Sequence, residues 1–211
     1  WPGLSWRWVD HALIRYVDIA GEQNIPAWYS GGVLLIAGLA ALAAYQLASY
    51  SAPRGERVAW LGVAALLLVM SLDEVVSIHE VVGRALRPAL TESVRGTVGN
   101  SLDGIVRTGW IIPGIVAVLL LVAAGAVGYR FAARRLRLRF VVGFGVFVLG
   151  ALGMEMVGSL VYEHPIPLLF ASHIEELLEM LGAAVMLLAV LSCFRLRHRN
   201  GSVVIDYRGD G

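Results

Sequence analysis

Long apolar segments alternate with short polar ones along most of this chain. Five apolar segments approach or exceed the roughly 20 residues that a membrane-spanning helix needs. They cover about Ala27 to Tyr50, Val58 to Glu80, Thr108 to Tyr129, Phe140 to Tyr162 and Ala171 to Phe194. The pattern predicts an all-α fold, a polytopic membrane helix bundle with five transmembrane helices.

Three longer segments lie outside these spans, besides the short turns between them. Residues 1–26 contain several charges, yet their apolar residues recur at helical spacing, which predicts an N-terminal interfacial amphipathic helix. These apolar residues are Trp6, Val9, Leu13, Ile14 and Val17. Residues 81–107 are polar and contain several glycines, which favours a loop with short helical pieces. Residues 195–211 are interpreted as a polar, mobile tail.

Composition agrees with a membrane protein, and the arginines give it an orientation. The chain is 58% hydrophobic with a mean hydropathy of +0.72, against about 45–50% apolar residues in soluble domains. Eleven of the 17 arginines, with three acids, fall in the turns near 54 and 130–139 and after residue 194. Cytoplasmic loops are rich in Lys and Arg. We therefore expect residues 1–26 outside the cell membrane, residues 27–194 as the bundle and residues 195–211 as a cytoplasmic tail.

Acidic and histidine side chains gather near the outer ends of three predicted spans. Asp73, Glu74, His79 and Glu80 close the second span, Glu155 lies in the fourth, and His173, Glu175, Glu176 and Glu179 open the fifth. Ionisable groups at membrane depth are costly, so by default they mark a functional site. Asp73 and Glu80 share one helical stripe, whereas His79 lies about 100° away and joins them only if the helix frays. Asp18 and Glu22 either cover this cluster or form a solvated face.

Carboxylates combined with imidazole, without thiolates, suit iron, manganese or zinc, and a carboxylate majority leaves calcium open. The single Cys193 excludes an intrachain disulfide and a cysteine-rich metal site. The spacing His173-x-x-Glu176 reverses the Glu-x-x-His pair of di-iron bundles. We predict a divalent-metal site, mono- or dinuclear, with these ligands: Asp73, His79, Glu80, Glu155, His173, Glu176 and Glu179.

Several simpler interpretations compete with a metal site. Outer arginines such as Arg84 or Arg107 could pair with the acids, and Glu175 could simply favour the positive end of a helix dipole. The pairs Gly143-x-Gly145 and Gly150-x-x-Gly153 lie inside a span, so they indicate helix packing rather than a phosphate loop. The cluster could also belong to a non-catalytic subunit of a larger membrane complex or a homo-oligomer. A proton or ion pathway is less favoured, because the inner halves of the spans are nearly uncharged.

Three segments resemble a widespread family of bacterial integral membrane proteins that has no assigned activity. They are Asp18-x-x-x-Glu22-x-Asn24-Ile25-Pro26-x-Trp28-Tyr29-Ser30, Ser71-Leu72-Asp73-Glu74 followed by His79-Glu80, and the run from Glu175 to Gly182. The resemblance implies a multi-pass protein of the bacterial inner membrane. It also implies one shared feature formed by Asp18, Glu22, Asp73, Glu74, His79, Glu80, Glu176 and Glu179. It transfers no reaction, so catalysis stays open, and the expected partners are lipids and membrane proteins rather than nucleic acid.

Overall fold

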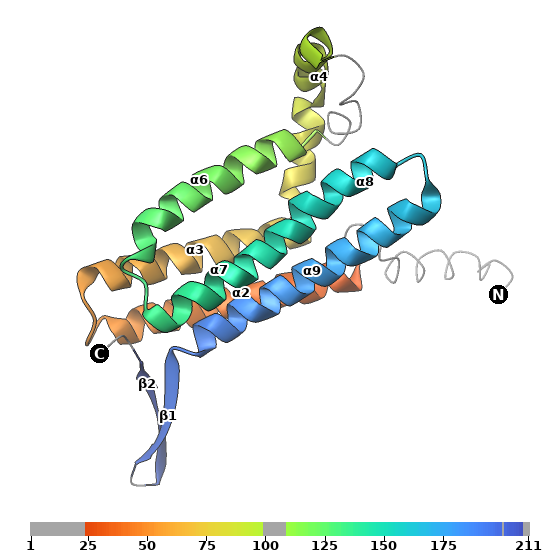
Figure 1. The fold of residues 1–211 in the computed structure, drawn as a ribbon. Coiled ribbons are helices and arrows are strands. Elements are labelled where there is room, and N and C mark those ends of the chain that lie inside the picture. The colour runs from red at the N-terminus through yellow and green to blue at the C-terminus, as the bar shows by residue number, and fades with distance from the viewer. Residues whose placement is uncertain (1–23, 99–108, 200, 209–211) are drawn as a thin grey trace, which may run out of the picture.

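A computed structural model describes residues 24–98, 109–199 and 201–208. Figure 1 shows that long helices make up most of this part of the chain. In chain order they are α2 (Ile25–Ala48), α3 (Arg54–Val76), α4 (Ile78–Val98), α6 (Ile111–Tyr129), α7 (Arg134–Val148), the π-helix η2 (Leu149–Met154), α8 (Glu155–Val161) and α9 (Pro165–Leu191). The all-α prediction is confirmed for the bundle. The outer segment predicted for residues 1–26 lies almost entirely outside the described residues, as do Asp18 and Glu22.

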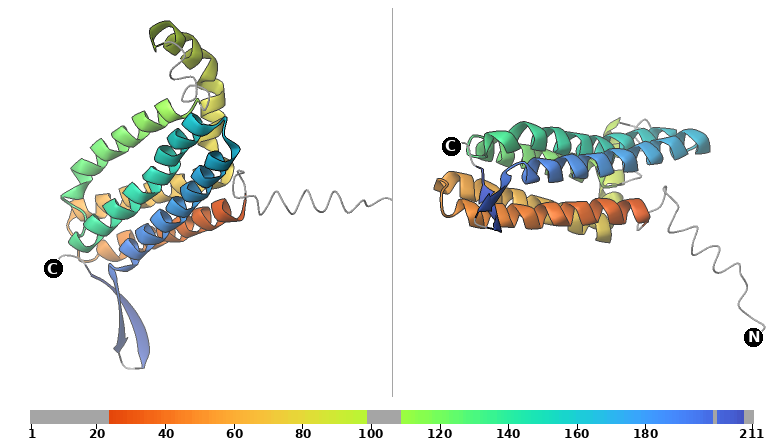
Figure 2. Two further views of the ribbon diagram at one scale, coloured as in Figure 1. Left: turned by 45° about the vertical axis from the view of Figure 1, so that its right-hand side comes forward. Right: turned by 90° about the horizontal axis from the view of Figure 1, so that it is seen from below.

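The helices form two layers around a narrow core. Figure 2 shows α2 and α3 in one layer and the helices from α6 to α9 in the other. Around the bundle, α3 packs on α2, α2 on α9, and α9 on the continuous rod of α7, η2 and α8. The remaining helix, α6, closes this circle more loosely by touching α3, α4 and η2. The interior of the circle is therefore bounded by α6 on one side and by close-packed helices on the others.

Small residues allow the tightest helix crossings. Ala37, Ala41 and Ala44 of α2 are fully buried and recur at helical spacing. A Cβ on Gly182 of α9 would lie 2.6 Å from the backbone nitrogen of Phe147 and 2.8 Å from the carbonyl oxygen of Gly143. The backbones of α7 and α9 thus approach closely where Gly143 faces Gly182. This contact confirms the packing interpretation for Gly143.

Three helices of the described chain are long and apolar enough to cross a membrane. They are Ile25–Ala48, Arg54–Val76 and Leu136–Val161, the last of which runs through η2. The other two predicted spans fall short for physical reasons. The apolar part of α6 covers only Ile111–Ala123, and α9 carries Glu175, Glu176 and Glu179 along its length.

The segment after the second predicted span is helical. The loop expected from residue 81 onward is wrong as far as Val98, because α4 runs without interruption from Ile78 through Pro88. This helix turns away from the bundle (Figure 1), and it contacts α3 and α6. Its exposed residues include apolar Val81 and Leu86 as well as charged Arg84 and Arg87. The helix therefore carries both apolar and charged residues. The glycines of this segment had favoured a loop instead.

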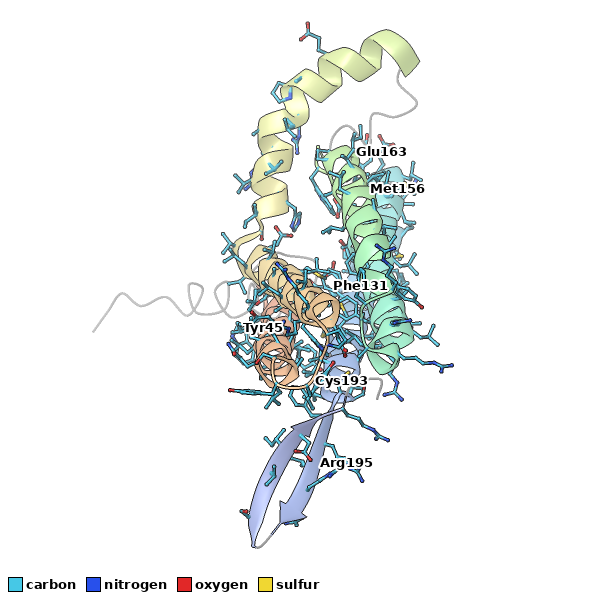
Figure 3. All side chains as sticks on the ribbon, turned by 90° about the vertical axis from the view of Figure 1, so that its left-hand side faces the viewer. Tyr45, Phe131, Met156, Glu163, Cys193 and Arg195 are labelled. Carbon is cyan, nitrogen blue, oxygen red and sulfur yellow. The ribbon has the colours of Figure 1, made fainter. Side chains whose placement is uncertain are left out.

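The C-terminal segment is a β-hairpin rather than the expected mobile tail. Strand β1 (Phe194–Arg199) pairs antiparallel with β2 (Ser202–Tyr207). Trp60 of α3 donates from Nε1 to the Tyr207 hydroxyl at 2.7 Å, and that hydroxyl donates to Glu56. Cys193 lies at the base of the hairpin (Figure 3), and its backbone carbonyl oxygen accepts the Arg208 N–H at 2.7 Å. These contacts hold the hairpin against the start of α3.

Candidate functional site

A cavity of about 810 Å³ lies within the circle of helices, between α3, α6, the α7–η2–α8 rod and α9. Seven carboxylates line one part of its wall. They are Asp73 and Glu74 of α3, Glu80 of α4, Glu155 of α8, and Glu175, Glu176 and Glu179 of α9. Acids from four helices, separated by up to about a hundred residues of sequence, therefore surround one space.

A break between α3 and α4 shapes the first part of this wall. Ser77 has a left-handed backbone (φ 54°, ψ 48°), which is uncommon for a residue other than glycine. Its N–H donates to the Asp73 carbonyl at 2.7 Å and closes α3, while its own carbonyl accepts from Val81 at the start of α4. The chain changes direction here without a linker. His79, which a continuous helix would point elsewhere, is turned toward Asp73.

Asp73 and His79 form a double hydrogen bond. One carboxylate oxygen accepts the His79 backbone N–H at 2.9 Å, and the other lies 2.9 Å from Nδ1 of the imidazole. Because an ionised carboxylate can only accept, Nδ1 carries the proton. The lone pair of the ring is then on Nε2, the nitrogen that can bind a cation or take up a proton. A carboxylate that orients an imidazole in this way is usual around metal-binding histidines.

The ring of His79 also packs on Trp110, with ring centroids 4.7 Å apart. Trp110 precedes α6 and lines the same cavity. Its position depends on Gly109, whose φ is +77° and whose Cβ, if present, would lie 2.4 Å from the Gly83 carbonyl oxygen on α4. Only glycine fits this close approach. The contact brings the start of α6 against α4 and completes the wall beside His79.

Glu80 lines the cavity and also forms an ion pair. Its carboxylate pairs with Nη1 of Arg84 at 2.7 Å, one helical turn further along α4. Arg84 is exposed and Glu80 is partly exposed, so this pair adds little stability. The pairing of an outer arginine with an acid, considered as an alternative from the sequence, is therefore present at Glu80.

The π-helix positions Glu155. Residues Leu149–Met154 wind more widely than an α-helix, and Glu155 follows directly. The wider turn occurs where Gly150 approaches α9, since a Cβ there would lie 2.9 Å from the Glu175 carbonyl oxygen. Such bulges shift the phase of the following residues and are frequent at functional sites. Here the residue after the bulge, Glu155, lines the cavity.

Helix α9 contributes three glutamates to the cavity wall, but its histidine lies outside that wall. Glu175, Glu176 and Glu179 line the cavity, whereas His173 is exposed and its Nδ1 bonds to the Leu169 carbonyl oxygen at 2.7 Å. Since α9 begins at Pro165, Glu175 lies in its third turn, and the helix dipole acts only within the first. The dipole explanation for Glu175 therefore fails, and His173 is not part of the cavity wall.

Asn24 joins the start of α2 to this acidic wall. Its side-chain oxygen accepts the Ala27 N–H at 2.8 Å and caps α2, while its nitrogen donates to Oε1 of Glu176 at 3.0 Å. Asn24 is buried. The sequence offered a signal for the cap, an Asn before Ile25-Pro26, but none for its second partner on α9.

The remaining wall of the cavity is apolar. Gly62, Ala65 and Leu66 of α3 line it, as do Val118 and Leu121 of α6 and Phe144 and Phe147 of α7. Along α3 and along the α7–η2–α8 rod these residues lie nearer the hairpin end than the carboxylates do. The cavity thus has an acidic end and a hydrocarbon-like end.

The predicted ligand set is only partly assembled. All of its members except His173 line the cavity, namely Asp73, His79, Glu80, Glu155, Glu176 and Glu179. Within the described chain, however, no three His, Cys, Asp or Glu side chains form a group that could hold one ion. A metal would therefore require rotation of carboxylate side chains toward one another. Metal ligation by these residues stays a prediction.

Comparison with known proteins places the chain in a family whose function is unknown. Residues 4–194 match the model of a family described as a domain of unknown function, DUF8692. No curated protein and no solved structure matches the chain.

Proposed function

Because the chain belongs to the DUF8692 family, whose function is unknown, we propose a function from the site alone. The protein is a multi-pass membrane protein that binds a divalent metal cation in its carboxylate-lined cavity, at the outer side of the bacterial inner membrane. The observation that carries this proposal is the presence of seven carboxylates and one imidazole on the wall of a single cavity. Like charges held together in low dielectric favour the uptake of a cation.

In this proposal all five long rods cross the membrane: α2, α3, α6, α7–η2–α8 and α9. Figure 1 supports the arrangement, because the five rods run beside one another. The α2–α3 turn, the α6–α7 turn and the hairpin lie at one end, and the α8–α9 turn lies at the other. Glu163 and Arg195 lie at the two opposite ends (Figure 3). The arginine-rich turns share the hairpin end, which the positive-inside rule assigns to the cytoplasm. The acidic end of the cavity then faces outward.

The donor set narrows the choice of metal. Oxygen donors far outnumber nitrogen donors, since His79 is the one imidazole among the described residues that line the cavity. Hard cations such as Ca²⁺ and Mn²⁺ prefer carboxylate oxygens. Fe²⁺ and Zn²⁺ would depend more strongly on Nε2 of His79. The donor set therefore suits Mn²⁺ and Ca²⁺, and we expect Zn²⁺ to compete with Mn²⁺, because Zn²⁺ generally binds a given set of donors more tightly.

Metal titration of the purified protein tests this function. Calorimetry with Mn²⁺, Ca²⁺, Fe²⁺ and Zn²⁺ should show saturable binding to the unmodified protein. The double variant Glu155→Gln/Glu176→Gln should bind Mn²⁺ at least about tenfold more weakly, which corresponds to 1.4 kcal/mol. The matched control is Glu163→Gln, because Glu163 is exposed and bonds to Tyr162 outside the cavity. Equal affinities for the double variant and the unmodified protein would exclude these carboxylates as ligands.

A non-catalytic subunit of a larger membrane complex is the second candidate. The observation that favours it is α4, which projects from the bundle and exposes apolar Val81, Val82 and Leu86. A partner protein could cover this surface. Purification as a stable, monodisperse single chain that retains metal binding would argue against this role.

A further inference from the structure

The hydrocarbon-like end of the cavity has no role in binding a metal. Its wall consists of aliphatic and aromatic side chains and the bare backbone of Gly62. A Cβ added at Gly62 would meet no atom within 4 Å. With a volume of about 810 Å³, the cavity lies within the range of roughly 300–1,000 Å³ usual for pockets that bury small organic ligands.

The cavity also opens toward the surrounding lipid. Val69 of α3 and Leu121 of α6 line it and are nevertheless 63% and 40% exposed. These two residues stand on α3 and α6, which touch each other only loosely. On the outer surface of α6, Leu119 and Leu120 are exposed and suit contact with acyl chains. A hydrophobic chain can therefore pass between α3 and α6 from the bilayer itself.

We propose that this cavity binds a membrane lipid, with one hydrocarbon chain between α3 and α6 and an amine-bearing head group at the carboxylates. This proposal rests on the proposed function, because it takes the metal cation to lie beside the head group. Apolar walls bury the chain, and each buried methylene contributes favourably. The carboxylates of the acidic end attract an amine.

The charge of the cavity wall determines which class of lipid head group fits it. The described residues that line the cavity contribute seven carboxylates and no arginine, and a divalent cation offsets two of these negative charges. A lipid head with a net negative charge is therefore repelled. Phosphatidylethanolamine, which carries a primary amine and no net charge, fits better than phosphatidylglycerol, whose net charge is negative.

The chain-binding end can be filled without touching the acidic end. Gly62→Leu places a side chain into open space on the cavity wall, one helical turn before Leu66 and three turns before Asp73 along α3. Gly125→Leu is the matched control, because Gly125 lies on α6, does not line the cavity and also has no atom within 4 Å of an added Cβ. A second filling variant, Ala65→Phe, covers the case in which Gly62→Leu folds poorly.

Native mass spectrometry of the full chain gives the readout. The protein is equilibrated in detergent with equal amounts of phosphatidylethanolamine and phosphatidylglycerol, and the bound lipid is counted. We expect one retained phosphatidylethanolamine per chain, at least fivefold preference over phosphatidylglycerol, and at least fivefold less retention by Gly62→Leu or Ala65→Phe. Gly125→Leu should behave as the unmodified protein.

Mn²⁺ titration of the same preparations separates this proposal from the metal site. Gly62→Leu should lose lipid and keep its Mn²⁺ affinity, whereas Glu155→Gln/Glu176→Gln should lose Mn²⁺ affinity. Lipid retention by the filled variants equal to that of the unmodified protein would overturn the chain site. Equal retention of the two phospholipids would overturn the amine assignment. Failure of Mn²⁺ to bind the unmodified protein would overturn the proposed function and leave the lipid measurement interpretable.

Discussion

The side-chain amide of Asn24 donates to Oε1 of Glu176 at 3.0 Å, although the two residues are 152 positions apart in the chain. The same side chain caps α2 through its oxygen. Asn24 therefore fixes the start of one helix against the acidic wall formed by another. This connection explains how the segment before the first span and the glutamates of α9 belong to one site.

Replacing Asn24 should separate its two roles. Asn24→Ala removes both the helix cap, worth about 1 kcal/mol, and the hydrogen bond to a charged group, worth about 1.5–3 kcal/mol. Asn24→Ser retains a capping oxygen and loses the donor to Glu176. In detergent, thermal unfolding should shift further for Asn24→Ala than for Asn24→Ser. Equal shifts would mean that the helix cap contributes nothing measurable, and an unchanged unfolding temperature for Asn24→Ser would mean the same for the hydrogen bond to Glu176.

The crossing of α7 and α9 should not tolerate a methyl group. Gly182→Ala places a Cβ 2.6 Å from the Phe147 backbone nitrogen, so the helices must separate, at a cost of about 1–3 kcal/mol. Gly145→Ala on the same crossing pair of helices adds a Cβ with no atom within 4 Å. We expect a lower unfolding temperature for Gly182→Ala and none of this loss for Gly145→Ala. A stable Gly182→Ala protein would contradict the close approach.

Attachment of the hairpin should depend on pH. Burial and the hydrogen bond to the Glu56 carboxylate raise the pKa of Tyr207 well above its usual value of 10.0. The unfolded tyrosine ionises near pH 10, while the folded one keeps its proton. The stability that this group contributes is therefore complete below pH 10 and declines above it, by at most about 1.4 kcal/mol per pH unit. Thermal unfolding from pH 8 to 11 should show a steeper loss for the unmodified protein than for Tyr207→Phe.

Asp73 should act on metal binding through His79. Asp73→Asn keeps the size of the side chain but places an amide beside Nδ1 at the 2.9 Å contact, which no longer holds the imidazole with its lone pair on Nε2. Loss of such an orienting carboxylate typically weakens metal binding about 10- to 100-fold. In a His79→Gln background the same change should have a much smaller effect, because the two residues act as a unit. Additive losses in Mn²⁺ titrations would instead make Asp73 an independent ligand.

The depth of the acids could be predicted from the sequence, whereas their final orientation could not. Arginine-rich turns and span lengths assign Asp73, Glu155 and Glu176 to one end of the bundle, and the structure places all three on one cavity wall. Orientation depends on two departures from regular α-helix. No glycine marks the left-handed Ser77, and Gly150 and Gly153, which lie within the π-helix, indicated helix packing from the sequence but not the wider turn.

One dipeptide in the sequence favours the hairpin, although the C-terminal segment was interpreted as a tail. Asn200-Gly201 stands between two segments of six residues, and Asn-Gly is the preferred dipeptide of a two-residue hairpin turn. A lone two-stranded hairpin is marginal in water, so the dipeptide alone would not have secured it. Its docking depends on Tyr207 meeting Trp60, a contact between residues 147 positions apart. His173 was predicted to join the acids, but it lies outside the cavity wall. Its Nδ1 bonds to the Leu169 carbonyl oxygen within α9.

The most direct test is the location of a bound metal ion by anomalous X-ray diffraction from crystals of the full chain grown with Mn²⁺. The account predicts one strong manganese peak inside the cavity, with carboxylate oxygens of at least two of the helices α3, α8 and α9 within about 2.0–2.6 Å of the ion. The carboxylate side chains of Glu155 and Glu176 should have rotated toward it. A cavity without manganese in crystals that bind the ion elsewhere on the protein would contradict the central claim.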